Sequence, residues 1–117
     1  MQLLVAVIND PQKLDEILAG LLVLGVRGAT VIHSEGMGMR LAGDIPLFAR
    51  LQTPIARVRP ENRTVFSVVH EDRVEPIMAL LQRVLGNLGD PGTGIAFTVP
   101  LDRVVGLAPP LPDEATG

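Results

Sequence analysis

Two short glycine-rich segments contain the residues of this sequence that are best suited to bind an anion. The first is Glu35-Gly36-Met37-Gly38-Met39, followed at once by Arg40, and the second runs from Gly89 to Gly94. Glycines let a backbone approach a phosphate group closely and direct N–H groups toward it. Neither segment ends in the Gly-Lys-Ser/Thr of a P-loop or opens a helix with G-x-G-x-x-G. Because each alone is more typical of a turn, a phosphate site needs a further argument.

The residue types give little support to catalysis or metal binding. The sequence has no cysteine, which excludes disulfides, thiol chemistry and Cys-based metal sites. Its two histidines, His33 and His70, have no carboxylates at ligand spacing, and we interpret them as surface residues at strand ends. No nucleophile-elbow glycine pattern surrounds Ser34 or Ser67. We therefore expect a protein that is not an enzyme and requires no cofactor.

The elements that position the glycine-rich segments can be predicted from hydrophobic periodicity. Two stretches have apolar residues at helical spacing along one face. The first, from Leu14 to Leu22, follows a predicted N-cap at Asp10, and Gly25 is expected to end it. The second, from Val74 to Leu88, ends at glycines and contains one proline, which must lie in the first turn. Short apolar runs rich in β-branched residues predict four strands: Gln2–Ile8, Ala29–Ile32, Arg63–His70 and Ile95–Val99.

The order of these elements predicts an α+β fold. Strand, helix and strand occur twice with no third repeat, which indicates a ferredoxin-like βαββαβ plait, an antiparallel sheet with two helices on one face. We assign residues 1–107 to this domain, with a short edge strand at Val104–Leu107. Residues 108–117 contain three prolines and are expected to form a flexible tail.

Composition restricts the partners of this domain. Apolar residues make up 47% of the chain, so a core can form, but the longest charge-free apolar run, residues 17–26, is far short of a membrane span. A net charge of −3, three phenylalanines and no tyrosine or tryptophan disfavour nucleic acid binding. Helices cover only one face of the predicted sheet, although its strands are apolar at nearly every position. We therefore expect a homo-oligomer, and a cytoplasmic location because cysteine is absent.

The connection between the second and third predicted strands is unusually long. It covers residues 35–62, whereas hairpin connections usually have about two to five residues. Residues 40–63 contain five arginines and two acids, a net charge of +3, whereas the remaining chain has five basic and eleven acidic residues. This separation of charge favours an anionic ligand or an acidic partner surface at the long loop.

Several motifs in order resemble the nitrogen-regulatory PII signal-transduction family. They are Lys13-Leu14-Asp15-Glu16, Gly25-Val26-Arg27-Gly28-Ala29-Thr30-Val31, Gly36-Met37-Gly38, the long loop, Gly89-Asp90 and Pro100-Leu101-Asp102-Arg103-Val104-Val105. The resemblance covers residues 1–107. It implies a homotrimer with adenine nucleotide bound in the clefts between subunits. It also implies that the long loop is the family's T-loop, whose residues 40–60 would dock on a transporter or an enzyme, in nitrogen regulation.

The resemblance assigns the nucleotide to the T-loop base, the turn after the second helix and a C-terminal segment. To these we add Arg40 and Arg103 as the cations to test first. The candidate nucleotide-binding residues are Gly36, Met37, Gly38, Met39, Arg40, Gly89, Asp90, Gly92, Thr93, Gly94 and Arg103.

Departures from the family pattern predict which nucleotide binds. Thr93-Gly94 stands where members usually have lysine, and two phosphate-binding arginines fall near Gly106 and Ala108. Arg40 replaces the glutamine used with magnesium and 2-oxoglutarate, and Asn62 lies near the position of the T-loop lysine. Loss of three cations favours AMP, ADP or a cyclic nucleotide over ATP. The alternative hypothesis is a CutA-like trimeric metal-binding or structural protein.

Overall fold

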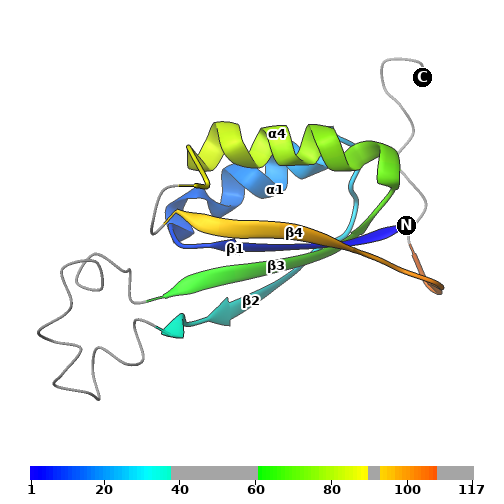
Figure 1. Ribbon diagram of the computed structural model, residues 1–117, viewed down its shortest axis with the longest axis horizontal. Helices are drawn as coiled ribbons and strands as arrows, with labels where there is room; N and C mark the ends of the chain where they lie inside the picture. Colours follow the sequence, from blue (N-terminus) through cyan, green and yellow to red (C-terminus); the bar gives the residue numbers. More distant parts are fainter. Residues whose placement is uncertain (38–60, 90–92, 108–117) are drawn as a thin grey trace, which may run out of the picture.

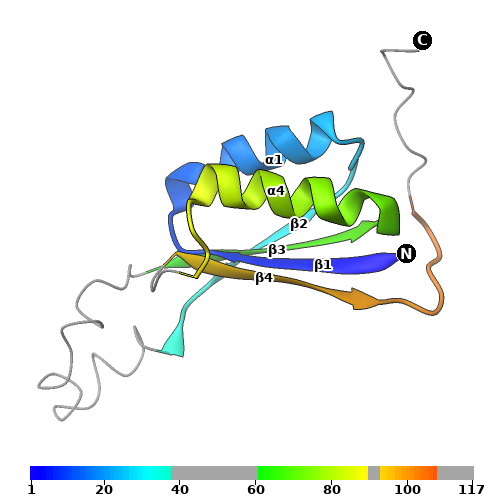
Figure 2. The same cartoon turned by 45° about the horizontal axis from the view of Figure 1, so that its top comes forward.

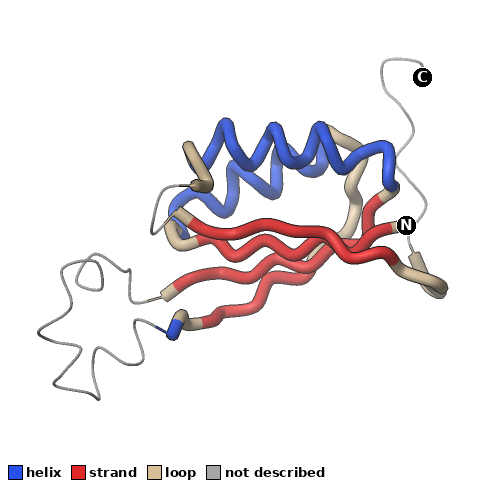
Figure 3. Tube along the Cα trace, in the orientation of Figure 1, coloured by secondary structure: helices blue, strands red, loops and turns tan. Residues whose placement is uncertain are grey.

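Strand β1 (Gln2–Ile8) lies inside the sheet, because it pairs along both edges. The computed structural model describes residues 1–37, 61–89 and 93–107. In it, β1 pairs antiparallel with β3 (Asn62–Val69) on one side and with β4 (Gly94–Pro100) on the other. Strand β2 (Thr30–Ser34) pairs antiparallel with β3, which gives the order β2-β3-β1-β4 (Figures 1 and 3). The predicted antiparallel sheet is confirmed.

Both helices cover the same face of this sheet (Figure 2). Helix α1 (Leu14–Val23) follows a 3₁₀ turn at Pro11–Lys13, and α4 (Val74–Leu85) follows another at Glu71–Arg73. The two helices pack on each other as well as on the sheet. This α+β arrangement of four antiparallel strands and two helices is consistent with the predicted ferredoxin-like fold.

The ends of α1 follow the local chemistry that the sequence indicates. The Asp10 carboxylate accepts a hydrogen bond from the backbone N–H of Gln12 at 3.1 Å, as an N-cap does. At the other end, Gly25 has a φ of +88°, and the N–H of Val26 donates to the carbonyl of Leu21 at 2.9 Å. This is a Schellman motif, which turns the chain from the helix toward β2.

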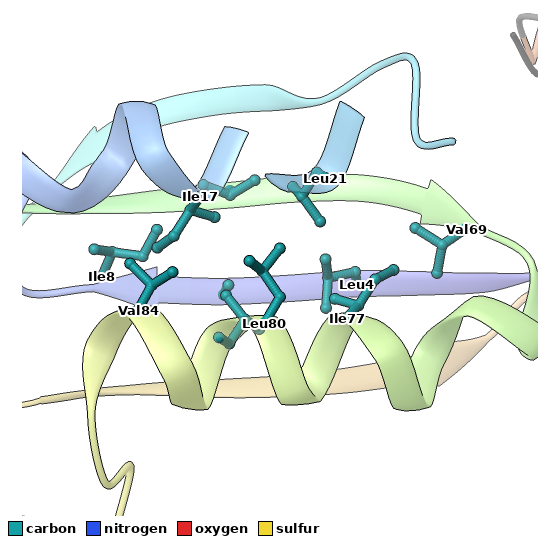
Figure 4. Close-up of a cluster of buried hydrophobic side chains, with 11 residues drawn as sticks. Leu4, Ile8, Ile17, Leu21, Val69, Ile77, Leu80 and Val84 are labelled. Carbon is teal, nitrogen blue, oxygen red and sulfur yellow. The ribbon is translucent and has the colours of Figure 1, made fainter. Parts of the chain in front are cut away.

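The core lies between the helices and the inner face of the sheet (Figure 4). It is built from aliphatic side chains, because the inward positions alternate along the strands and recur every three or four residues along the helices. Removing this aliphatic area from water is the main stabilising term of the fold. Its buried members are Leu4, Ala6, Ile8, Ile17, Leu21, Val65, Val69, Ile77, Leu80, Leu81 and Val84.

The opposite face of the sheet, which we call the outer face, is also apolar and has no helix over it (Figures 1 and 2). On β4, Ile95, Phe97 and Val99 are 57%, 44% and 42% exposed. The register places Val7, Val5 and Leu3 of β1 opposite these three residues, and Phe66 of β3 opposite Val5. The expectation of a second apolar sheet face is confirmed.

Some predicted details are wrong. Residues 104–107 form no strand: the N–H of Leu101 still donates to the carbonyl of Met1, but Gly106 then turns the chain at a φ of +89°. Leu22, predicted to lie on the buried stripe of the first helix, is 51% exposed. Strand β2 begins and ends later than predicted. No helix among the described residues is long and apolar enough to span a membrane.

Candidate functional site

Both glycine-rich segments are attached to one end of the sheet. The register places His33, Arg63, Ile8 and Gly94 in one row across β2, β3, β1 and β4. The long loop leaves β2 just after this row, and the α4–β4 connection enters β4 at it. In Figure 1 the end of β2, the end of α4 and the start of β4 lie at the left end of the molecule. The fold therefore attaches the two predicted anion-binding segments to the same end of the sheet.

Within one subunit, the described parts of the two segments extend from strands that are not neighbours. Strands β3 and β1 separate β2 from β4, so three interstrand spacings, about 14 Å in all, lie between them. A phosphate contacts its ligands at about 3 Å, and backbone N–H groups so far apart cannot share one. We call the described parts of the two segments, residues 35–37, 89 and 93–94, the candidate half-sites of one subunit.

Arg103 lies at the other end of the sheet. It follows Pro100, which pairs with Gln2, whereas Gly94 pairs with Ile8. Six residues of strand span about 20 Å. Arg103 therefore cannot reach an anion held at the glycine-rich end of its own subunit. Six of the eleven candidate residues are described: Gly36, Met37, Gly89, Thr93, Gly94 and Arg103. The other five, Gly38, Met39, Arg40, Asp90 and Gly92, lie outside the described residues.

A chain of polar side chains joins the two ends of the long loop. The Ser34 hydroxyl donates to the Asn62 Oδ1, and the Ser34 and Thr64 hydroxyls lie 2.8 Å apart. Because the Ser34 proton goes to Asn62, the Thr64 hydroxyl must donate to Ser34. Asn62 and Thr64 are on β3 and Ser34 is the last residue of β2. These bonds hold the two ends of the loop in fixed register. The sequence pattern did not identify this polar chain, because its residues are 28 or 30 positions apart.

Two of the candidate glycines, Gly94 and Gly36, differ in whether the fold leaves room for a side chain. A Cβ on Gly94, whose φ is +144°, would lie 2.4 Å from the carbonyl oxygen of Val7, so the sheet itself requires a glycine there. A Cβ on Gly36 would make only an ordinary contact, 3.7 Å from Asn62 Nδ2. The described fold therefore requires a glycine at position 94, but it gives no steric reason for a glycine at position 36.

Few of the described cations lie near the glycine-rich end of the sheet. Arg63 forms an ion pair with Glu61 at 3.2 Å and also donates to the carbonyl of Asn62. His33 lies at the glycine-rich end of the sheet, whereas His70 follows β3 at the opposite end, so the two histidines cannot bind one metal within a subunit. Among the described residues no group of three or more His, Asp or Glu side chains could hold a metal ion.

The comparisons with known proteins agree with this fold. The family model described as Nitrogen regulatory protein P-II matches residues 1–109. The match includes both glycine-rich segments, the long loop and Arg103. No curated protein matches the chain.

Proposed function

The chain belongs to the nitrogen regulatory protein P-II family, and we propose on that premise that it is a homotrimer that binds an adenine nucleotide between its subunits. Members of this family are trimeric regulators of partner proteins rather than enzymes. The family match over residues 1–109 carries the proposal. In this proposal residues 40–60 dock on a regulated transporter or enzyme, and the nucleotide changes their conformation. A role in nitrogen regulation is the family expectation.

The outer face supports the assembly. Phe66, Phe97, Ile95 and the valines of β1 form a continuous apolar surface by register. Monomeric proteins rarely expose apolar patches larger than a few hundred Å². Covering this face with the same face of other subunits removes it from water and needs no additional partner.

The separation of the half-sites supports a nucleotide site between subunits. One subunit holds β2 and β4, from which the two glycine-rich segments extend, about 14 Å apart, and Arg103 lies at the far end of the sheet. A neighbouring subunit can supply the missing wall of each half-site and bring its own Arg103 to the phosphates. Glycine at position 36 would then permit close approach of the ligand, a role that the described fold does not otherwise require.

The charge of the chain supports a nucleotide with few phosphates. Each charge-assisted hydrogen bond to phosphate contributes about 1.5–3 kcal/mol, so loss of three family cations weakens triphosphate binding most. We propose AMP, ADP or a cyclic nucleotide as the effector, with ATP the weakest of the set.

Calorimetric titration of the full chain with AMP, ADP, ATP and cyclic AMP tests the ligand. At least one nucleotide should bind, and Gly36→Ala should weaken it at least tenfold while the unfolding midpoint stays unchanged. Gly25→Ala is the control, because Gly25 lies in the α1–β2 turn far from the loop. Failure of all four nucleotides to bind, with the assembly intact, would refute the effector and leave the trimer standing.

Sedimentation equilibrium tests the assembly separately. Phe97→Ser on the outer face should shift the protein from trimer toward monomer without loss of helical circular dichroism. Val23→Ser is the matched control, because Val23 is 86% exposed but lies on α1. A wild-type chain that sediments as a monomer at micromolar concentration contradicts the proposal.

A further inference from the structure

Asn62, the first residue of β3, holds a nearly buried amide group beside Gly36. Asn62 is 8% exposed, and its Oδ1 accepts the proton of the Ser34 hydroxyl. In the described part of the chain, no residue accepts a hydrogen bond from Asn62 Nδ2. Every fully buried side-chain nitrogen or oxygen there has a partner, so Nδ2 is in contact with solvent. The amide therefore offers two N–H donors to a ligand.

The glycine at position 36 keeps the space beside these donors open. Asn62 Nδ2 is the atom nearest to a Cβ built on Gly36, at 3.7 Å. An acceptor that binds this nitrogen would lie about 2.9 Å from it, so a side chain at position 36 would crowd the acceptor. A ligand at Asn62 therefore gives a reason for Gly36 that the packing of the described fold does not give.

The two hydroxyl groups beside Asn62 fix the orientation of its amide. Ser34 donates its proton to Oδ1, and Thr64 donates its proton to Ser34. Turning the amide over would place Nδ2 against Ser34 and would require both hydroxyl protons to reverse direction. The donors are therefore held toward Gly36 before a ligand arrives, which lowers the entropy lost on binding.

We propose that the Asn62 amide donates a hydrogen bond to a phosphate oxygen of the nucleotide, an inference that rests on the proposed function. Phosphate oxygens are strong acceptors, and a glycine backbone can add further N–H donors to them. Asn62 lies four residues before Phe66 on β3, so strand alternation places it on the outer face, which the neighbouring subunits would cover. An uncharged donor suits a nucleotide with few phosphates, since the nearby Arg63 is already paired with Glu61.

Calorimetric titration of full-chain variants with adenosine and ADP tests the contact. Asn62→Leu, which has no N–H donor, should weaken ADP binding at least tenfold and change adenosine binding by less than about twofold. Ser67→Ala is the matched control, because it also removes a side-chain hydrogen bond from β3 and should leave both affinities unchanged. Ser34→Ala should weaken ADP binding about two- to fivefold, and Ser34→Thr, which keeps the hydroxyl, should restore it. Unchanged ADP affinity in Asn62→Leu, or an equal loss for adenosine, would overturn the proposal.

Nuclear magnetic resonance of the ¹⁵N-labelled wild-type chain tests the donors directly, with inorganic phosphate as the probe. Phosphate should move the side-chain N–H signals of Asn62 and leave those of Gln82, an exposed residue of α4, in place. This response without binding of any nucleotide would refute the proposed function and support the phosphate contact. Nucleotide binding that leaves the Asn62 signals unmoved, or an equal shift at Gln82, would overturn the inference and leave the proposed function standing.

Discussion

Replacing Gly94 by alanine should destabilise the fold far more than the same change at either of two other glycines. The new Cβ would lie 2.4 Å from the carbonyl oxygen of Val7, and the φ of +144° is one that residues with a Cβ rarely adopt. Backbone strain of this kind costs about 1–3 kcal/mol, and moving β1 away from the contact costs a further 1–3 kcal/mol or so. We expect a total near 4 kcal/mol, which is a large part of the stability of a domain this size.

Two control variants separate the causes in a urea titration. Gly25 has a φ of +88° but no atom within 4 Å of a new Cβ, so Gly25→Ala should cost only about 1–2 kcal/mol. Gly36 has neither problem, and Gly36→Ala should change stability by less than about 0.5 kcal/mol. At a urea slope of about 2 kcal/mol/M, Gly94→Ala should lower the midpoint by about 2 M. Equal midpoints for the Gly94 and Gly25 variants would refute the steric argument.

Two further predictions concern single hydrogen bonds. Lys13 Nζ donates to the carbonyl of Val84 in the last turn of α4 at 2.8 Å. Lys13→Met should lower the free energy of unfolding in urea by about 1–2 kcal/mol, and Lys13→Arg should lower it less. An unchanged urea midpoint for Lys13→Met would contradict this prediction. The buried Ser67 hydroxyl donates to the carbonyl of Gly28 at 2.6 Å. Ser67→Ala should lower the free energy of unfolding by about 1–2 kcal/mol and speed amide exchange in the connection between α1 and β2. Unchanged exchange in that connection would show that this bond does not hold it.

The elements of the fold could be predicted because local signals and burial agree. Asp10 caps the first helical turn and Gly25 ends α1, as the sequence indicates, and β1 has the predicted bounds. The first turns of both helices are 3₁₀, a distinction that residue types do not encode because both helix forms accept the same N-terminal residues.

The wrong sequence predictions occur where pairing or burial depends on a segment that is distant in the sequence. Residues 104–107 are apolar enough for a strand, but a strand also needs a hydrogen-bonding neighbour, and the pairing of the chain with β1 ends at Leu101. Leu22 fits the helical stripe, but its exposure depends on where the next connection runs. Periodicity reports the composition of a face and not the presence of a partner for it.

The candidate site depends on segments distant in the sequence even more than the burial of Leu22 does. The resemblance to the PII family groups Gly36, Gly94 and Arg103 into one nucleotide site. The fold instead places Gly94 at the start of β4 and Gly36 just after β2, at one end of the sheet but beside strands that are not neighbours, and Arg103 at the other end. Because six residues of β4, about 20 Å, separate the glycine-rich end of the sheet from the end where Arg103 lies, the proposed shared anion needs the Arg103 of a second subunit. The same three residues that resemble a binding motif in the sequence therefore become an argument for assembly in the structure. If the proposed trimer forms the proposed nucleotide site, nucleotide affinity should fall together with the trimer when Phe97 is replaced, although Phe97 belongs to neither glycine-rich segment.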